Sequence, residues 1–486
     1  MHKCSPFCSS FKEKRLTHGV LVGSLLAAFT ISIVFKSYFC TQLSAWKSAP
    51  LQGEVIEVSS FETLIRALNN RVHIQSQSSM DAAENQFMMF KDAGLLQELV
   101  EESTSAKSIF NACHCEPISN YCEINGDVAV QGNSSTISMV SLRTGIPAGE
   151  ISWTVKPYVR KENAAAMDLV KSWAVTSMEF LHCDLIQTVP AILFSLGGFS
   201  GNHFHDFSDL VIPLYITSRQ FNGEVQFVVT DNRHWWISKF RGILAKLSRY
   251  NIVDIDQERK THCYPSMIVG LKYHHELGID QSKSQLSMKD FRQFLRRTYS
   301  LKRAKAIKIG DDARKMPRLL IITRRKSRSF TNIDKITRVA SSLGYNVVTM
   351  EPNISTSLGS VAETVNSCDV LMGIHGAGLT NMVFLPDNAI VIQIVPLGSI
   401  DELAKQDFEQ PAMDMELRYL EYKIKAKESS LISKYKADHL IIKDPLSVHK
   451  QGWDAVRSVY LDKQNVKLDV KRFRPTLLKA LQLLHQ

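Results

Sequence analysis

The feature that most constrains the fold is an apolar run that ends in a glycine-rich turn, LMGIHGAGLTN at residues 371–381. Such a run predicts a buried strand, followed by a turn and then a helix. Gly376 and Gly378 allow the backbone to turn sharply and to approach a ligand closely. The first N–H groups of the following helix favour an anion, and a diphosphate is the guest we expect. In the alternative interpretation, these glycines serve only tight strand-to-helix packing.

The surrounding sequence places this turn inside an alternating α/β unit. Strands are predicted at 319–323, 346–349, 369–374 and 389–395, with helices at 334–342 and 360–367 between them. Strands that alternate with helices indicate a parallel, Rossmann-like sheet. A dinucleotide oxidoreductase is disfavoured because its G-x-G-x-x-G motif follows the first strand, whereas this turn follows a later one and lacks the third glycine.

A similar pattern precedes this unit. Strands are predicted at 189–195, 225–230 and 266–270, with helices at 204–218, 235–248 and 288–299. The polar stretch 310–317 separates the two patterns, so the fold class we expect is α/β, with two Rossmann-like domains. Their predicted bounds are residues 108–310 and 311–486.

The N-terminal region has a different composition. Residues 19–35 contain no charge and follow Lys12, Lys14 and Arg15, which predicts a transmembrane anchor of roughly 26 Å with a cytosolic tail at 1–18. A cleaved signal peptide is the alternative, but the run is longer than a usual signal-peptide core. The polar segment 36–107 is predicted to be a stem. Everything after the anchor would then face a lumen.

Charge, sequons and cysteines limit the function further. The net charge of +10 suits phosphates or an acidic polysaccharide, whereas the short, scattered basic clusters disfavour nucleic acid. Asn133 and Asn353 begin glycosylation sequons, as expected of a lumenal chain. In an oxidising lumen, the close group Cys113, Cys115 and Cys122 favours a disulfide over a zinc site, because its spacing is poor for zinc and no second ligand pair follows.

Three further segments carry a resemblance to a known family. They read GFSGNHFHDFSD from Gly198, PRLLIITRRKSR from Pro317 and GIHGAGLTN from Gly373. In this order they resemble glycosyltransferase family 61, most closely its plant branch that decorates xylan, over roughly residues 108–486. The resemblance implies a GT-B-like pair of Rossmann domains facing a cleft, a nucleotide-sugar donor, inversion at the anomeric carbon and a type II Golgi membrane protein.

Inverting transfer needs a base to take the proton of the acceptor hydroxyl. His205 and Asp209 are four residues apart, so on a helix they share one face, and a carboxylate can orient the imidazole. The family pattern is met here by Asn202, which we place on the acceptor side, and by the His–Asp pair; Asp206 is the competing base. In the structural alternative, Asn202 only caps the helix, and the contact between His205 and Asp209 only stabilises it.

The donor is expected at the ends of the C-terminal strands. Arg324, Arg325 and Arg328 follow the strand at 319–323, where guanidinium groups can hold a diphosphate and stabilise the leaving group. We expect at least one of these arginines to pair only with surface carboxylates. A phosphate cradle is predicted from His375 and the turn that follows it, namely Gly376, Ala377, Gly378, Leu379, Thr380 and Asn381.

Asp254 and Asp256 have the Asp-x-Asp form with which other transferases bind a metal, but they lie far from the predicted donor site in the sequence, and we expect a turn there. No metal or other cofactor is expected to be obligatory, since arginines can neutralise the diphosphate, although stimulation by a divalent ion is compatible with this site.

The expected reaction is transfer of a pentose, xylose or arabinofuranose, from a UDP-sugar to xylan or its side groups in the Golgi lumen. Alternatives are transfer of another sugar to a glycoprotein, or a catalytically silent partner that binds UDP or polysaccharide and forms complexes with other Golgi transferases.

Overall fold

The computed structural model describes residues 113–115, 120–140, 152–310, 315–351 and 356–486. All of them belong to one compact unit. The predicted cytosolic tail 1–18, anchor 19–35 and stem 36–107, and the sequon at Asn353, lie outside the described residues. In the part that is described, no helix combines the length and the apolar character that a membrane span requires.

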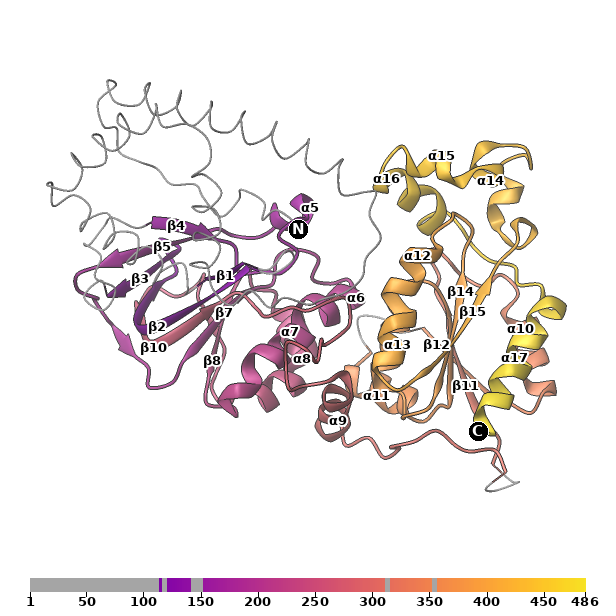
Figure 1. Ribbon diagram of the computed structural model, residues 1–486, viewed down its shortest axis with the longest axis horizontal. Helices are drawn as coiled ribbons and strands as arrows, with labels where there is room; N and C mark the ends of the chain where they lie inside the picture. The colour runs from indigo at the N-terminus through magenta and orange to yellow at the C-terminus, as the bar shows by residue number, and fades with distance from the viewer. Residues whose placement is uncertain (1–112, 116–119, 141–151, 311–314, 352–355) are drawn as a thin grey trace, which may run out of the picture. The chain divides into compact units, whose positions relative to one another are not determined.

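The N-terminal half contains a mixed sheet whose strand order is β4-β5-β3-β2-β10-β7-β8-β9, with β1 beside β2 and β6 beside β10 (Figure 1). Strands β10, β7 and β8 run parallel, as predicted, and the short strand β9, which was not predicted, is parallel to β8. The strands are β1 (Cys113–Cys115), β2 (Asn120–Gln131), β3 (Thr136–Val140), β4 (Ser152–Val155), β5 (Trp173–Met178), β6 (Leu185–Ile186), β7 (Ala191–Ser195), β8 (Gln226–Thr230), β9 (Val253–Asp254) and β10 (His262–Val269).

The prediction of a purely parallel sheet is wrong for this half. Strand β2 is antiparallel to both β3 and β10, and β4 is antiparallel to β5. Side chains along β2 alternate between buried and more exposed positions over 121–125, which is the pattern of an antiparallel strand with one face toward water. Partly polar strands of this kind give no continuous apolar run in the sequence.

Helices α6, α7 and α8 lie together on one side of this sheet (Figure 1). The predicted helix 204–218 is a composite of α6, a π-helix and α7. The helical segments of this half are α5 (Ala164–Met167), α6 (His203–His205), the π-helix Asp206–Val211, α7 (Ile212–Ser218), the 3₁₀ helix Arg219–Phe221, α8 (His234–Leu247) and α9 (Met288–Thr298).

The C-terminal half contains a fully parallel sheet in the order β12-β11-β13-β14-β15. The sequence predicts four of these strands, β11 to β14, and their parallel direction. Strands β13 and β14 are buried along their whole length, which explains their continuous Val and Ile content. The strands are β11 (Arg318–Ile322), β12 (Asn346–Met350), β13 (Val370–Ile374), β14 (Ile390–Val395) and β15 (Arg418–Lys423).

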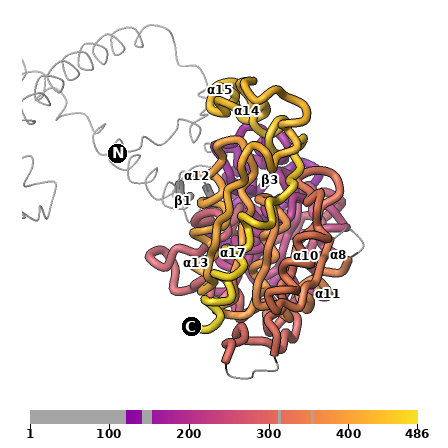
Figure 2. The backbone as a smooth tube through the Cα atoms, turned by 90° about the vertical axis from the view of Figure 1, so that its right-hand side faces the viewer, coloured from indigo at the N-terminus to yellow at the C-terminus, as the bar shows by residue number. Residues whose placement is uncertain are grey.

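Helices cover both faces of this sheet: α10 and α17 lie on one side, and α11, α12 and α13 on the other (Figure 1). Figure 2 looks at the side on which α10 and α17 pack together. The helices are α10 (Ile333–Ser342), α11 (Leu358–Asn366), the 3₁₀ helix Ala377–Phe384, α12 (Asp401–Ala404), the π-helix Lys405–Glu409, α13 (Gln410–Asp414), the 3₁₀ helices Ala426–Glu428 and Ser430–Ser433, α14 (Leu440–Lys443), α15 (Pro445–His449), α16 (Trp453–Val456), the π-helix Arg457–Leu461 and α17 (Val470–Leu484).

One hydrophobic core cluster runs through both halves, from Phe194 and Phe207 to Leu320 and Met382. Helix α9 strengthens this connection because its buried Arg292 donates hydrogen bonds to the carbonyls of Leu385 and Met415 in the C-terminal half. The segment predicted to end the first domain therefore also packs on the second.

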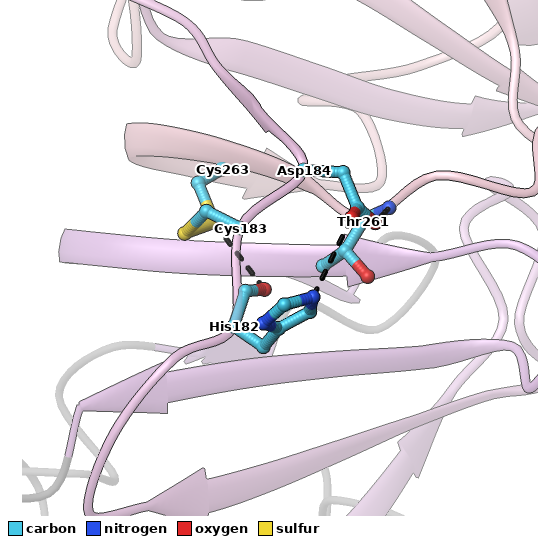
Figure 3. The surroundings of a disulfide bond; sticks show 5 residues. All are labelled: His182, Cys183, Asp184, Thr261 and Cys263. Atoms are coloured by element: carbon cyan, nitrogen blue, oxygen red, sulfur yellow. Dashed lines mark hydrogen bonds and ion pairs between the residues drawn. A yellow bond between two sulfur atoms is a disulfide. The ribbon is translucent and has the colours of Figure 1, made fainter.

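Cysteines stabilise the N-terminal half. Cys183 and Cys263 form a disulfide between chain positions 80 residues apart (Figure 3). The adjacent Asp184 accepts a hydrogen bond of 2.7 Å from the Thr261 amide. Cys122 is also disulfide-bonded.

Candidate active site

The candidate base lies at the start of a capped helix. The side-chain oxygen of Asn202 accepts a hydrogen bond of 3.1 Å from the Phe204 amide, so Asn202 is the N-cap of α6. Gly201 precedes it with φ of 104°, a left-handed conformation that glycine adopts without strain. Asn202 therefore has the capping role of the structural alternative, whereas its predicted acceptor-side role stays a prediction.

His205 and Asp209 are in contact, as the four-residue spacing predicts. His205 Nδ1 lies 3.0 Å from Asp209 Oδ2, and the same oxygen accepts hydrogen bonds from Tyr158 at 2.8 Å and from Arg160 at 2.7 Å. Burial of Asp209 would raise its pKa, but the hydrogen bond from His205 and the charge of Arg160 outweigh it and lower the pKa. Asp209 is thus held as a carboxylate that can orient the imidazole of His205.

Arg160 extends this network to a second carboxylate. Its Nη2 donates a hydrogen bond of 2.7 Å to Glu276, which also accepts one of 2.6 Å from Ser208. We call these five residues, His205, Asp209, Arg160, Glu276 and Ser208, the carboxylate network. Arg160 and Glu276 were missed by the sequence analysis, because single charged residues far apart in the chain carry no motif.

Asp206, the competing base, is completely buried and satisfied by other partners. Its carboxylate accepts hydrogen bonds from the Gly201 amide, from Trp236 Nε1 and from Lys239 Nζ, at 2.7, 2.9 and 2.8 Å. These contacts fix the turn before α6 to helix α8. The geometry therefore favours His205 over Asp206 as the proton acceptor.

Two of the three predicted arginines meet at the glycine turn. A Cβ placed on Gly376 would lie 2.7 Å from Arg328 Nη1 and 2.8 Å from Arg324 Nη1, and Gly376 itself has φ of 137°. Arg328 Nη1 donates a hydrogen bond of 3.1 Å to the His375 carbonyl. Since β11 and β13 are parallel neighbours, their carboxyl ends bring the arginines and the turn to one edge of the sheet. We call Arg324 and Arg328 the arginine pair.

The arginine pair has the electrostatic character of an anion site. Among the described residues, neither guanidinium group has a carboxylate oxygen within 4 Å, the distance of an ion pair. Burial lowers the pKa of both groups, and for Arg328 burial and the charge of Arg324 lower it to about 10. Asp462, which is ion-paired with Arg457, acts on both arginines only as a nearby negative charge. Two adjacent, partly buried cations without an ion-paired carboxylate would gain from a bound phosphate.

Arg325 does not join this pair. Its side chain is 88% exposed and forms an ion pair of 2.6 Å with Glu351. The expectation that at least one of the three arginines pairs with a surface carboxylate is met by this residue.

The predicted cradle itself is partly used within the protein. His375 is buried, its Nδ1 lies 2.8 Å from Gln393 Nε2, and burial together with the arginine pair lowers its pKa to about 3, so it is neutral. The Leu379 amide donates to the Gly376 carbonyl inside the turn. The predicted helix is a 3₁₀ helix, Ala377–Phe384, and the hydroxyl of its buried Thr380 has no partner among the described residues.

Contacts bring the carboxylate network and the arginine pair into one region. Phe408 packs against Phe204 in α6 and against His375, with ring centroids 5.7 Å apart in both cases. His203 Nε2 lies 3.1 Å from Asn381 Oδ1, which joins α6 to the end of the predicted cradle. Burial and the charge of Lys239 lower the pKa of His203 to about 4, so this contact is made by a neutral imidazole.

Asp407, next to Phe408, is a further site residue that the sequence did not reveal. Its Oδ2 lies 3.8 Å from His375 Nε2. Burial and the charge of Glu276 raise the pKa of Asp407 to about 7. It stands on the π-helix Lys405–Glu409, whose widened turn gives no pattern in the sequence.

Asp254 and Asp256 are engaged elsewhere. Asp254 accepts a hydrogen bond of 2.7 Å from Asn232, and Asp256 accepts hydrogen bonds from Lys171, Thr230 and the Asp231 amide. The turn expected after Val253 begins only at residue 255, because Asp254 is the last residue of β9. These aspartates hold the ends of β8 and β9 together.

Comparison with known proteins identifies relatives of this chain. The model of the family Glycosyltransferase 61 matches residues 271–392, which include Glu276 and the glycine turn. The chain is 44% identical to an α-1,3-arabinosyltransferase of Oryza sativa subsp. japonica, over 76% of this chain and 63% of the relative. It is 42% identical to a β-1,2-xylosyltransferase of the same plant, over 75% of this chain and 82% of the relative. It is 35% identical to a xylan glycosyltransferase of Arabidopsis thaliana, over 74% of this chain and 77% of the relative.

The similarity to the xylosyltransferase covers most of that relative at high identity. The chain therefore belongs to glycosyltransferase family 61. It spans a little under two thirds of the arabinosyltransferase relatives, 63% of one and 64% of another.

Proposed function

We propose that this protein is an inverting glycosyltransferase that moves a pentose, xylose or arabinofuranose, from a UDP-sugar to xylan or its side groups. Its family membership and the activities named for its rice and Arabidopsis relatives support the proposal. The observation that carries it is the placement of an oriented histidine and an unpaired arginine pair in one region, connected through Phe408.

In the proposed mechanism His205 is the base. Its Nδ1 is engaged by the Asp209 carboxylate, so Nε2 is the nitrogen left to accept the proton of the acceptor hydroxyl. The acceptor oxygen then forms a bond to the anomeric carbon as the bond from that carbon to the diphosphate oxygen breaks. The carboxylate of Asp209 stabilises the imidazolium that forms.

The arginine pair would bind the diphosphate and stabilise the charge that it gains as it leaves. Gly376 admits both guanidinium groups, since any Cβ at this position would collide with them. Two cations can supply this stabilisation, so the proposed mechanism needs no metal ion; a divalent ion bound with the donor would add to it.

We also propose that the described part of the chain works in the Golgi lumen, with residues 19–35 as a type II membrane anchor. The Cys183–Cys263 disulfide and the disulfide-bonded Cys122 suit an oxidising compartment. Asn133 lies in the exposed turn between β2 and β3, where a glycan can be attached. Complexes with other Golgi transferases remain part of this proposal.

The test is a transfer assay with the purified full chain, a panel of UDP-sugars and xylo-oligosaccharide acceptors, read by mass spectrometry. The proposal predicts the gain of one pentose from UDP-xylose or UDP-arabinofuranose, with inverted configuration by NMR. Transfer only of another sugar, or only to a glycoprotein, would refute the pentose and xylan assignment. UDP binding without transfer to any acceptor would indicate a silent binding partner.

A further inference from the structure

A pocket of about 660 Å³ lies beside the carboxylate network. One wall comes from the segment after β10, with Tyr273, Glu276 and Asp280, and the other from the π-helix and α13, with Gln406, Gln410 and Asp414. Its volume falls in the range of small-molecule sites, roughly 300–1,000 Å³.

The lining has the chemistry of a carbohydrate site. The carboxylates of Glu276 and Asp280 and the amides of Gln406 and Gln410 can exchange hydrogen bonds with the hydroxyl groups of a sugar. The described residues that line the pocket include no lysine or arginine. In a chain of net charge +10, this makes it an unsuitable place for a phosphate.

The pocket is connected to the proposed base, His205, by hydrogen bonds. Glu276 lines the pocket and accepts a hydrogen bond from Arg160, whose Nε donates to the carboxylate that orients His205. On the opposite wall, Gln406 and Gln410 flank Asp407 and Phe408, which lead to His375 and the arginine pair. A ligand in the pocket would thus extend away from the reacting centre on the side without cations.

We propose that this pocket binds the neutral sugar chain of the acceptor and so holds the reacting hydroxyl near His205. The inference rests on the proposed transferase function and assigns to it an acceptor subsite built by residues 273–281 and 406–414. The amides of Gln406 and Gln410 contact the sugar hydroxyls, and Glu276 connects the subsite to the carboxylate network.

The test uses the full chain, a UDP-pentose donor and xylotetraose as acceptor. Replacing both glutamines by alanine, Gln406→Ala with Gln410→Ala, should raise the acceptor KM about tenfold through two lost hydrogen bonds. Affinity for UDP and slow hydrolysis of the donor without acceptor should not change. Gln410→Trp fills the pocket, so the transfer rate of this variant should no longer saturate as the acceptor concentration rises. Gln257→Ala, in an exposed turn after β9, is the matched control.

An unchanged acceptor KM in both pocket variants would overturn the proposal. If the wild type transfers no sugar, the transferase function fails separately, and saturation-transfer NMR with xylotetraose then decides about the pocket. Signals present with wild type and with Gln257→Ala, but lost with Gln410→Trp, would support a saccharide site. Equal signals with all variants, or none with wild type, would refute it.

Discussion

The carboxylate network and the arginine pair are opposite electrostatic designs within one region. In the network, each charge has a partner: Arg160 lies between Asp209 and Glu276, and His205 rests on Asp209. In the arginine pair, two cations share a glycine turn without a carboxylate in ion-pair distance among the described residues. The first arrangement is complete in the free protein and keeps an imidazole oriented. The second is complete only when an anion is bound.

The largest effect is expected for the base. His205→Ala should reduce sugar transfer by about 10²- to 10⁴-fold, the usual contribution of a general base, while UDP affinity stays the same because the arginine pair is intact. Transfer is measured by mass spectrometry and UDP binding by calorimetry. His234→Ala, at an exposed position at the start of α8, is the control. Transfer at a wild-type rate by His205→Ala would return Asp206 to consideration as the base.

The next effect concerns stability in the network. Arg160→Met leaves the buried Asp209 carboxylate and Glu276 without their cation, so the free energy of unfolding should fall by about 3–5 kcal/mol. Urea unfolding followed by circular dichroism measures this loss. A decrease in the free energy of unfolding of less than about 1 kcal/mol would show that the ion pairs of Arg160 do not stabilise the network.

The same substitution in the arginine pair should act in the opposite way. Arg328→Met should weaken UDP binding by about 10- to 100-fold, since it removes a charge-assisted contact. Its free energy of unfolding should change by less than about 1 kcal/mol, because the guanidinium has no carboxylate partner to lose. Arg325→Met, which affects only the exposed pair with Glu351, should leave UDP affinity unchanged. Equal losses of affinity in both variants would place Arg325 in the donor site as well.

The last expected effect is a dependence of stability on pH. The pKa values of His203, about 4, and His375, about 3, lie below the unfolded value near 6.5. Their contribution to stability is therefore complete above pH 6.5 and is lost as the pH falls, because only the unfolded chain takes up these protons. Each histidine should lower the free energy of unfolding at pH 5 by about 2 kcal/mol relative to its value at pH 7.5.

Urea unfolding of His203→Asn and His375→Gln between pH 7.5 and 5 measures this difference. Each variant should lose less stability on acidification than the wild type does. Parallel pH profiles for wild type and both variants would mean that these imidazoles are not protected from protons in the folded protein.

The sequence predicted the C-terminal half better than the N-terminal half, for a physical reason. Strands such as β13 and β14 are buried on both faces, so their apolar runs are continuous, and their alternation with helices indicates that they run parallel. In the N-terminal half, β2 alternates buried and exposed side chains and pairs antiparallel on both sides.

The candidate site could be predicted where its residues share a helical spacing or follow neighbouring parallel strands. His205 with Asp209 shows a helical spacing, and Arg324 with Gly376 follows strands that end at one edge of a sheet. Arg160, Glu276 and Asp407 come from three distant segments, and only the folded chain brings them to the same place. The neutral state of His375 also depends on burial by Phe408 and on nearby arginines, which a single sequence does not specify.

The Cys183–Cys263 disulfide has a practical consequence for making this protein. It closes a loop of 80 residues that contains α6, the π-helix Asp206–Val211 and α8. His205, Ser208 and Asp209 of the carboxylate network therefore lie inside the loop. By the chain-entropy model, closing such a loop lowers the entropy of the unfolded chain and so stabilises the folded protein by about 4.5 kcal/mol. Material produced in a reducing cytosol would have to fold without this restriction, whereas secretion from a eukaryotic host would supply it before purification.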